Sequence, residues 1–455
     1  MVPLRTATRF IFDQYIIVPE EKTITFEYVI EYPDHPAERF REVLTVPWVT
    51  AARWRSIPKK MLDRALQTLH VALGVSYWKM YCPPELFIKP GTWTKEQLDF
   101  WKTIYTQGMG EFYYKNQIDF RDLVHFGCAT LVNQVEPVTR SQKPRCLVPI
   151  GGGKDSATTV QLLESQQISF DAFTMGSSHI QEAFVEVLNV FYKSIERQLD
   201  PLMIARSKAK EVYNGHVPVS LAYFFTGLLA AVLGDYRYVV FSNEKSANIG
   251  NVEYLGMEVN HQWSKSLACE TLVRHYLATY VTPSIEIFSL LRPLHEIEIM
   301  RRFVGYGKYF SVVSSCNRNF VVSSPQPKTE QGAYWCGTCP KCTFVFALFA
   351  AFLPKEQVCE LFGKNLFADE ALLPLYQALL GLKGIKPFEC VGLPEEVLVA
   401  FAEARMHGAW SDDVVMKWVI DQGLLEPSVI EGMKKELFAV GSLETLPELF
   451  KKCFA

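Results

Sequence analysis

The sequence has no apolar stretch long enough to cross a membrane and no excess of basic charge. Its longest apolar run, residues 344–353, is far shorter than the roughly 20 residues that a membrane-spanning helix needs. Residues 1–19 mix charged and apolar side chains, so they lack the unbroken apolar core of a secretion signal. The formal net charge of −3 provides no global attraction to nucleic acid. We therefore expect neither a membrane nor a nucleic acid as a partner.

Low-complexity tracts, internal repeats and blocks of like charge are also missing, which argues against a disordered or solenoid protein. Hydrophobic residues make up 49% and aromatic residues 13% of the chain, as in ordinary globular proteins. The 11 cysteines are an odd number without an export signal, which indicates a reducing compartment. A chain of 455 residues is expected to form two or three domains. The sequence predicts a cytoplasmic globular protein.

Three regions differ in their hydrophobic patterns. Residues 1–143 combine strand-like alternation at 24–30 and 42–46 with helical spacing at 58–72 and 95–106, so we expect an α+β domain. Residues 144–352 alternate between strand and helix patterns. Residues 353–455 show short helices at 372–382, 394–405 and 412–422, which predicts a small helical region.

The middle region is predicted to be an α/β domain with a parallel sheet. Its strand candidates are residues 146–150, 169–174, 201–205, 238–242, 286–290 and 310–314, with helices at 218–233 and 261–281 among those between them. Alternation of this kind predicts a sheet that helices cover on both faces. Ligands of such sheets bind at the carboxyl ends of the strands.

A glycine loop follows the first of these strands and opens a helix. It consists of Gly151, Gly152, Gly153, Lys154, Asp155 and Ser156. Backbone N–H groups and the positive end of a helix favour an anion at such a turn, and glycine lets a phosphate approach closely. The kinase-type P-loop needs a hydroxyl directly after its lysine, and the dinucleotide fingerprint needs a third spaced glycine, so neither pattern matches. The loop predicts a phosphate site of another kind, with an unliganded glycine turn as the alternative.

Three cysteines with short spacings, Cys336, Cys339 and Cys342, precede an apolar helix. Two intervening residues allow a turn to present both thiolates to one tetrahedral metal, and Cys316 is the natural fourth ligand. Four cysteines would make a structural zinc site, because no position is left for water. Reduced thiols without a metal, or a redox pair, are the alternatives.

Several other polar residues are candidates for the site. Ser242, Asn243 and Glu244 follow the strand at 238–242, which places them at the same sheet edge as the glycine loop, unless they form an ordinary polar turn. His216 precedes one predicted helix and His261 opens another, and either could titrate near neutrality or have only a structural role, such as capping the helix. Cys390 could be an acid–base thiol, although buried cysteine is more often inert.

The glycine loop resembles the PP-loop, Ser-Gly-Gly-x-Asp-Ser, of enzymes that cleave ATP between its α and β phosphates. Five of six positions match, and Gly151 stands where that family has serine. The whole chain resembles a narrower family, the ATP-dependent UDP-N-acetylmuramoyl-L-alanyl-L-glutamate epimerases of peptidoglycan synthesis. This likeness rests on residues 66–87, 110–114, 149–156, 241–248, 336–346 and 386–392. The four cysteines also resemble the zinc knuckle of 7-cyano-7-deazaguanine synthase, another PP-loop enzyme.

The resemblance implies a PP-loop, adenine nucleotide alpha hydrolase-like fold and inversion of the terminal L-glutamate of UDP-MurNAc-L-Ala-L-Glu, with ATP and Mg²⁺ consumed through an acyl adenylate. It implies Mg²⁺ on Asp155, phosphate oxygens on Lys154 and Ser156, and backbone contacts from the three glycines. The acid–base candidates for the α-proton are His216, His261, Glu244 and Cys390. Residues 1–143 and the C-terminal region would bind the UDP-muramoyl part. Arg292 and Arg318 are candidate anion partners for the diphosphate or for the glutamate side chain, with ordinary solvent-facing arginines as the alternative.

Three other functions share parts of this pattern. A PP-loop ligase or nitrile-forming synthase would activate a carboxylate by adenylation and then admit ammonia. An RNA-thiolating enzyme would bind transfer RNA, which the acidic net charge disfavours. A non-catalytic protein would bind the nucleotide without turnover.

Overall fold

The computed structural model describes residues 6–176, 178–320 and 334–455, and its described strands form one ten-stranded sheet and a small hairpin. One half of the large sheet is parallel, in the order β12-β9-β6-β7-β8. Its strands are β6 (Lys143–Pro149), β7 (Phe170–Met175), β8 (Tyr192–Gln198), β9 (Tyr236–Phe241) and β12 (Glu286–Ser289). The predicted α/β class is confirmed, although the sheet as a whole is mixed.

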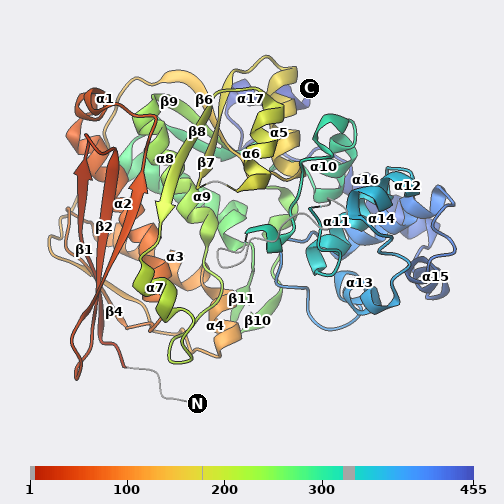
Figure 1. Cartoon of the computed structure of the whole chain (residues 1–455), viewed down its shortest axis with the longest axis horizontal. Helices are drawn as coiled ribbons and strands as arrows, with labels where there is room; N and C mark the ends of the chain where they lie inside the picture. Colours follow the sequence, from red (N-terminus) through yellow and green to blue (C-terminus); the bar gives the residue numbers. More distant parts are fainter. Residues whose placement is uncertain (1–5, 177, 321–333) are drawn as a thin grey trace.

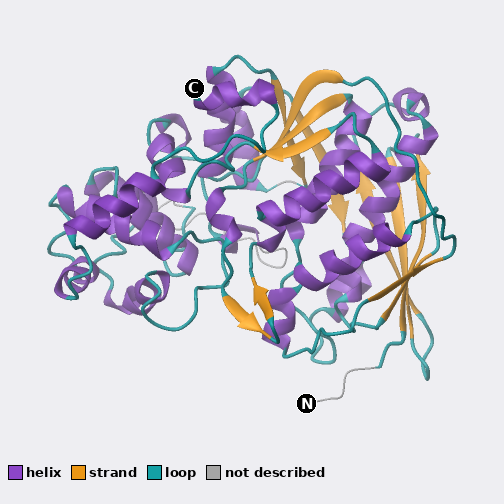
Figure 2. Cartoon of the chain, turned by 180° about the vertical axis from the view of Figure 1, so that it is seen from behind, coloured by secondary structure: helices purple, strands orange, loops and turns teal. Residues whose placement is uncertain are grey.

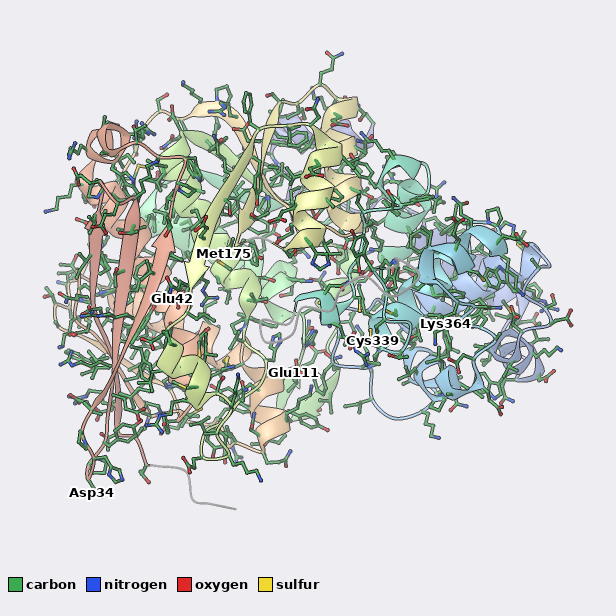
Figure 3. The ribbon with its side chains drawn as sticks, viewed as in Figure 1. Asp34, Glu42, Glu111, Met175, Cys339 and Lys364 are labelled. Atoms are coloured by element: carbon green, nitrogen blue, oxygen red, sulfur yellow. The ribbon has the colours of Figure 1, made fainter. Side chains whose placement is uncertain are left out.

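The N-terminal strands extend this sheet beyond β8 (Figure 1). They are β3 (Glu38–Thr45), β2 (Thr23–Glu31), β1 (Arg9–Val18), β4 (Glu85–Ile88) and β5 (His125–Cys128), in that spatial order. Where β3 meets β8, the Arg197 guanidinium donates to both carboxylate oxygens of the fully buried Glu42, at 2.6 and 3.3 Å. Glu42 is labelled in Figure 3. One sheet therefore spans the predicted boundary at residue 143.

The strand order creates a switch point between β6 and β9. The chain runs outward from β6 to β7 and β8, then returns to the other side of β6 to form β9 and β12. Loops that follow β6 and β9 consequently leave the sheet on either side of a crevice, where ligands of open α/β sheets bind. These loops contain the glycine turn and residues 242–244.

The parallel strands separate two hydrophobic cores. Along β9, Tyr238 and Val240 belong to one core, whereas Val239 and Phe241 belong to the other. Successive side chains of a strand point to opposite faces, so a strand covered on both sides is apolar throughout. This double burial explains the continuous apolar runs in the sequence.

Helices cover both faces of the sheet. The nearly all-apolar α8 (Val219–Gly234) is buried because it packs against β9 on one side and α2 (Lys59–Trp78) on another. The α5 helix (Lys154–Ser165) starts at the glycine loop and packs against α10 (Glu296–Phe303). The other α-helices and strands described before residue 300 are α1 (Ala51–Ser56), α3 (Lys95–Gln107), α4 (Gly110–Asn116), α6 (His179–Leu188), α7 (Pro201–Arg206), β10 (Val252–Tyr254), β11 (Met257–Val259) and α9 (Leu267–Tyr276).

The C-terminal part is helical, as predicted, and gathers at the end of the molecule opposite the N-terminal strands (Figures 1 and 2). It contains α11 (Pro340–Ala350), α12 (Lys355–Phe362), α13 (Leu373–Leu379), α14 (Pro394–Met406), α15 (Val414–Asp421) and α16 (Pro427–Leu437). The last helix, α17 (Glu448–Lys451), returns to the sheet, where Phe450 packs on Tyr238 and Phe288. Among the described residues, no helix has the length and apolar character required to span a bilayer.

Two predicted strands are wrong, and one predicted helix begins later than expected. Residues 201–205 form α7 instead of a strand, because Asp200 caps the backbone N–H of Leu202 and Pro201 suits the first helical turn. Residues 310–314 follow a short 3-10 helix (Gly307–Tyr309) as a turn and coil, and no strand is present there. The helix predicted from residue 261 begins at Leu267, so His261 lies in the turn after β11.

Candidate active site

The glycine loop is a tight turn with one open side. Gly152 has φ +82° and an ideal Cβ there would lie 2.7 Å from Ile180 Cγ2, so only glycine fits without strain. At Gly151 the nearest atom to such a Cβ is Ser156 Oγ, at 3.8 Å. The Gly151 N–H donates to that oxygen at 3.0 Å. Gly151 is exposed, and a Cβ there would make only this one ordinary contact, so the loop is open to a ligand on this side.

Behind the loop lies a buried ion-pair cluster. The Lys154 ammonium pairs with Asp155 and with Glu296, and the Lys341 ammonium lies 3.6 Å from Glu296. Burial acts to raise the pKa of Glu296, but Lys154 and Lys341 outweigh it and lower the pKa to about 2. Side-chain exposure is 28% for Asp155 against 4% for Lys154. Asp155 is the group of this cluster that can reach a ligand from solvent.

The loop after β9 lies next to this cluster. Asn243 Nδ2 donates to Ser289 Oγ at 3.0 Å, whereas Ser242 Oγ is buried without a partner in the described structure. Glu244 is buried, and burial together with the charges of Glu296 and Asp155 raises its pKa to about 7. A carboxyl group with this pKa can both give and take a proton at neutral pH.

Cys390 forms the centre of a second cluster. Its Sγ lies 3.1 Å from Lys265 Nζ, and His261 hydrogen-bonds to the thiol. Burial acts to raise the pKa of Cys390, but Lys265 and His261 outweigh it and lower the pKa to about 5. For His261, burial acts to lower the pKa, but Cys390 and Glu111 raise it to about 9. At neutral pH the pair is therefore a thiolate and an imidazolium.

Glu111 and His216 support His261 from its other side. His261 Nδ1 contacts the Glu111 carboxylate, from which His216 Nδ1 is 3.5 Å away. Burial acts to raise the pKa of Glu111, but its bond to His261 lowers it to about 2. Burial and the charge of His261 lower the pKa of His216 to about 3, so this ring is neutral. Glu111, labelled in Figure 3, belongs to α4 in the N-terminal region.

Two lysines connect the clusters. Lys265 contacts Cys390 and interacts electrostatically with Glu244 and Asp155. Lys341 pairs with Glu296 and donates to the backbone oxygen of Cys390. The structure thus connects His216 to His261 and His261 to Cys390, and Glu244 interacts electrostatically with the same Lys265 that contacts Cys390.

The two candidate arginines occupy different surroundings. Arg292 is buried, pairs with Glu270 at 2.7 Å, and donates to the backbone oxygens of Glu244 and Lys265, each at 2.8 Å. It holds both loops in place, and its charge is already balanced by Glu270. Arg318 is exposed, in a 3-10 helix (Asn317–Phe320).

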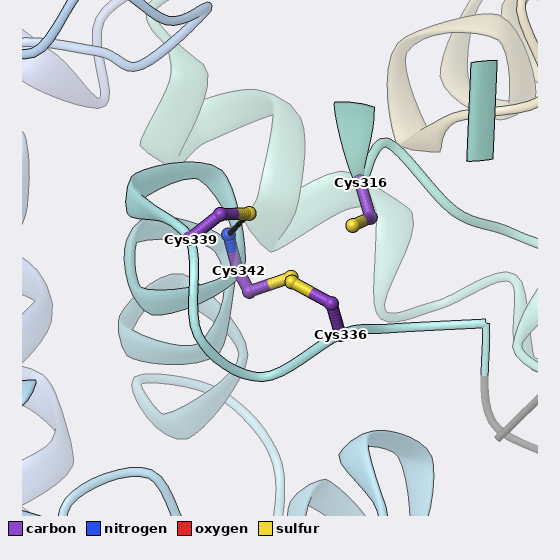
Figure 4. A group of neighbouring side chains, drawn as sticks. All are labelled: Cys316, Cys336, Cys339 and Cys342. Carbon is purple, nitrogen blue, oxygen red and sulfur yellow. Dashed lines mark hydrogen bonds between the residues drawn. The ribbon is translucent and has the colours of Figure 1, made fainter. Parts of the chain in front are cut away.

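Four cysteines meet at the start of α11 (Figure 4). The sulfur atoms of Cys316, Cys336, Cys339 and Cys342 all lie within 4.8 Å of one another, which is suitable for one metal ion. Cys339 caps α11, since its Sγ accepts from the backbone N–H of Cys342 at 3.4 Å. The predicted grouping of these cysteines is confirmed.

Sequence reasoning missed several residues of this site: Glu111, Lys265, Glu296 and Lys341. The position of Glu296 after the end of β12 and that of Lys341 between two cysteines were available signals. Glu111 and Lys265 carry no comparable local pattern, because only the fold brings α4 and the turn before α9 to Cys390.

The parallel sheet carries a glycine turn at its switch point. Beside that turn lie a cysteine–histidine pair and a carboxyl group that can ionise near neutral pH. This combination is typical of an α/β enzyme with acid–base chemistry. Residues 2–290 match the MurL N-terminal domain and residues 312–428 match the MurL C-terminal domain. The chain belongs to the MurL family of epimerases.

Curated relatives agree with this assignment. A UDP-N-acetyl-alpha-D-muramoyl-L-alanyl-L-glutamate epimerase of a Micromonospora strain is 33% identical over 454 residues, which are 99% of each chain. Enzymes of the same name from Xanthomonas oryzae pv. oryzae and Salinispora tropica are 35% and 34% identical. Those matches cover 81% of this chain and 81% of the relative, and 92% of this chain and 89% of the relative, respectively.

Proposed function

We propose that this protein inverts the terminal L-glutamate of UDP-MurNAc-L-Ala-L-Glu to D-glutamate in the synthesis of peptidoglycan precursors. ATP is converted to AMP and pyrophosphate in the same reaction. The observation that carries this proposal is the position of Cys390 relative to the glycine loop. Lys265 contacts Cys390 and interacts electrostatically with Asp155 of that loop. An acid–base group beside a site of carboxylate activation is what epimerisation at an α-carbon requires.

The need for ATP follows from the acidity of the α-carbon. A carboxylate resists loss of its α-proton, because the resulting enolate would place a second negative charge beside the first. In the proposed reaction, a carboxylate oxygen attacks the α-phosphorus of ATP, pyrophosphate leaves, and the acyl group of the resulting adenylate no longer carries the negative charge of the carboxylate oxygens. Each unit by which this lowers the α-carbon pKa removes about 1.4 kcal/mol from the cost of deprotonation.

The glycine loop contains the groups that adenylation of the carboxylate needs. Its open side at Gly151 suits backbone contacts to the leaving pyrophosphate, and Ser156 Oγ can donate its own proton to a phosphate oxygen. The partly exposed Asp155 would hold Mg²⁺, whose chemistry is to neutralise the phosphate charge. Lys154 is already paired with Asp155 and Glu296 behind the loop, so it would hold the loop in place and would reach a phosphate oxygen only by exchanging one of these partners.

Two groups that interact with Lys265, namely Cys390 and Glu244, suit proton transfer in the proposed reaction. The Cys390 thiolate removes the α-proton from one face, and protonated Glu244 returns a proton to the other. The Lys265 ammonium, which is near both groups, stabilises the developing enolate oxygen. Water then hydrolyses the adenylate of the inverted glutamate. The neutral Cys390 thiol and ionised Glu244 regain their starting states by exchange with solvent.

His261, Glu111 and His216 would act as positioning residues. The His261 imidazolium stabilises the Cys390 thiolate, and Glu111 holds His261 in its protonated form. His216 completes the buried contact to Glu111. Because α4 supplies Glu111, the N-terminal region takes part in the site, in addition to its proposed binding of the UDP-muramoyl group.

We further propose that the four cysteines hold a structural zinc ion. A site with four thiolate ligands has no position for water, so it would contribute stability and no chemistry to the reaction. Its place at the start of α11 would fix Lys341, which lies between Cys339 and Cys342 and contacts Glu296.

The decisive experiment is incubation of the purified protein with ATP, Mg²⁺ and UDP-MurNAc-L-Ala-L-Glu, followed by hydrolysis and chiral analysis of glutamate. D-Glutamate is expected, with AMP and pyrophosphate formed at the same time, and in D₂O the product should carry deuterium at its α-carbon. ADP as the product would refute the phosphate-loop assignment, and unlabelled D-glutamate would refute deprotonation. Product formation that requires ammonia would instead indicate a ligase or nitrile-forming synthase.

A further inference from the structure

One lysine of the site has no assigned partner. Lys386 lies in the segment between α13 and α14, four residues before Cys390. Its Nζ is shielded from solvent and makes no hydrogen bond and no ion pair with the part of the chain that the structure describes. A buried ammonium group without a partner is costly, and native structures normally reserve such groups for a ligand or a function.

The backbone around Lys386 is fixed. Asn251 Nδ2 donates to the carbonyl oxygens of Lys386 and Pro387, at 3.2 and 2.9 Å. Further along the segment, Gln262 Nε2 donates to the carbonyl oxygen of Val391 at 3.2 Å. The position of Lys386 relative to Cys390 is therefore set by contacts to the turns on either side of β10 and β11.

Lys386 lies within the acidic interior of the site. Burial lowers the pKa of Lys386, while Glu396, Glu244, Glu296 and Cys390 act to raise it. These four groups attract the ammonium electrostatically, yet none of them forms an ion pair with it, and burial outweighs their attraction so that the pKa is lowered. A direct anionic contact would offset that cost of burial.

The other cations of the site already have anionic partners. Lys154 contacts Asp155 and Glu296, and Lys341 also contacts Glu296. Lys265 contacts Cys390, and Arg292 contacts Glu270. A substrate with two carboxylates adds two charges to this interior. Among the described cations of the site whose charged nitrogen is shielded from solvent, Lys386 has no anionic contact and is therefore the candidate for one of them.

We propose that Lys386 binds the side-chain carboxylate of the terminal glutamate and determines specificity for an acidic residue there. This inference rests on the proposed function. The α-carboxylate loses its charge on adenylation, whereas the side-chain carboxylate remains charged throughout and needs a permanent cationic partner. Cys390 acts on the α-carbon, and the side-chain carboxylate, two methylene groups away, would lie close to that thiol.

The test compares substrates that end in L-glutamate and L-glutamine in the wild type and in Lys386→Met. Removing one partner of a buried charge pair commonly costs at least 2 kcal/mol, or about 30-fold. We expect kcat/KM for the glutamate substrate to fall about 30-fold or more in Lys386→Met, and that for the glutamine analogue to change less than about threefold. Lys383→Met, in an exposed lysine of the same segment, is the matched control and should behave as the wild type.

Each other outcome overturns the inference. Equal losses with both substrates, together with loss of substrate-dependent exchange of pyrophosphate into ATP, would assign Lys386 to the α-carboxylate or to phosphate. A wild type that does not distinguish the two substrates would remove the basis for a specificity residue. Should Lys386→Met fail to fold, Lys386→Arg must keep the preference for glutamate.

Failure of the proposed function can be recognised separately. A wild-type protein that forms no D-glutamate and no AMP would refute epimerisation. Equilibrium binding of the two nucleotide dipeptides would then still decide on Lys386, because the inference requires tighter binding of the glutamate form in the wild type and no preference in Lys386→Met.

Discussion

Replacement of Lys265 by methionine isolates the electrostatic cause of the reactive thiol. The substitution keeps the length and apolar stem of the side chain and removes the ammonium that lies 3.1 Å from Cys390 Sγ. His261 remains in place, so the thiol keeps one of its two main cationic partners. We therefore expect a higher pKa for Cys390 without loss of the fold.

The size of the change follows from Coulomb's law. Two unit charges 3.1 Å apart interact with about 5 kcal/mol at an effective dielectric constant of 20. Water that enters beside the methionine would screen the remaining charges and reduce the measurable loss to about half, or about two pKa units. The pKa of Cys390 should consequently rise from about 5 to about 7 or higher.

The assay is the rate of alkylation of Cys390 by iodoacetamide as a function of pH, followed by mass analysis of the peptide. The thiolate is the reactive form. The wild type should reach its full rate below pH 7, whereas Lys265→Met should still gain rate above pH 7. Identical profiles in both proteins would refute the assignment of the low pKa to Lys265, and Lys383→Met provides the surface control.

Three other predictions concern the proton groups, the loop and the metal. The rate of epimerisation in the L-to-D direction should fall as the pH drops through about 5, because Cys390 becomes protonated. It should also fall as the pH rises through about 7, because Glu244 loses the proton that it must donate. A flat pH–rate profile would contradict these roles. Gly152→Ala should abolish adenylation and lower the melting temperature, because φ is +82° and Ile180 occupies the space of the added Cβ. Gly151→Ala should melt like the wild type. Equal melting temperatures for the two variants would be inconsistent with the strained turn. Elemental analysis should find about one zinc per chain, lost together with stability in Cys339→Ser; metal-free wild type of full stability would exclude the zinc.

Local patterns sufficed for features that lie within a short stretch of chain. The turn at 151–156 was recognisable because its chemistry depends on consecutive residues between a strand and a helix. The cysteines at 336, 339 and 342 were recognisable because a metal fixes their spacing. The strand at 192–198 was missed and a strand was wrongly expected at 201–205, because β8 is polar and partly exposed, whereas α7 begins with apolar residues.

The amino-acid sequence by itself determined the α/β class, the glycine turn at the end of β6 and the family to which the chain belongs. Only the tertiary structure decided which acid–base groups meet. Glu111, Lys265 and Cys390 are separated by more than a hundred residues from one another, and their contact depends on how the N-terminal and C-terminal parts pack around the sheet edge. Because a pKa is set by burial and by neighbouring charges within a few ångströms, the thiolate at residue 390 exists only once that packing is complete.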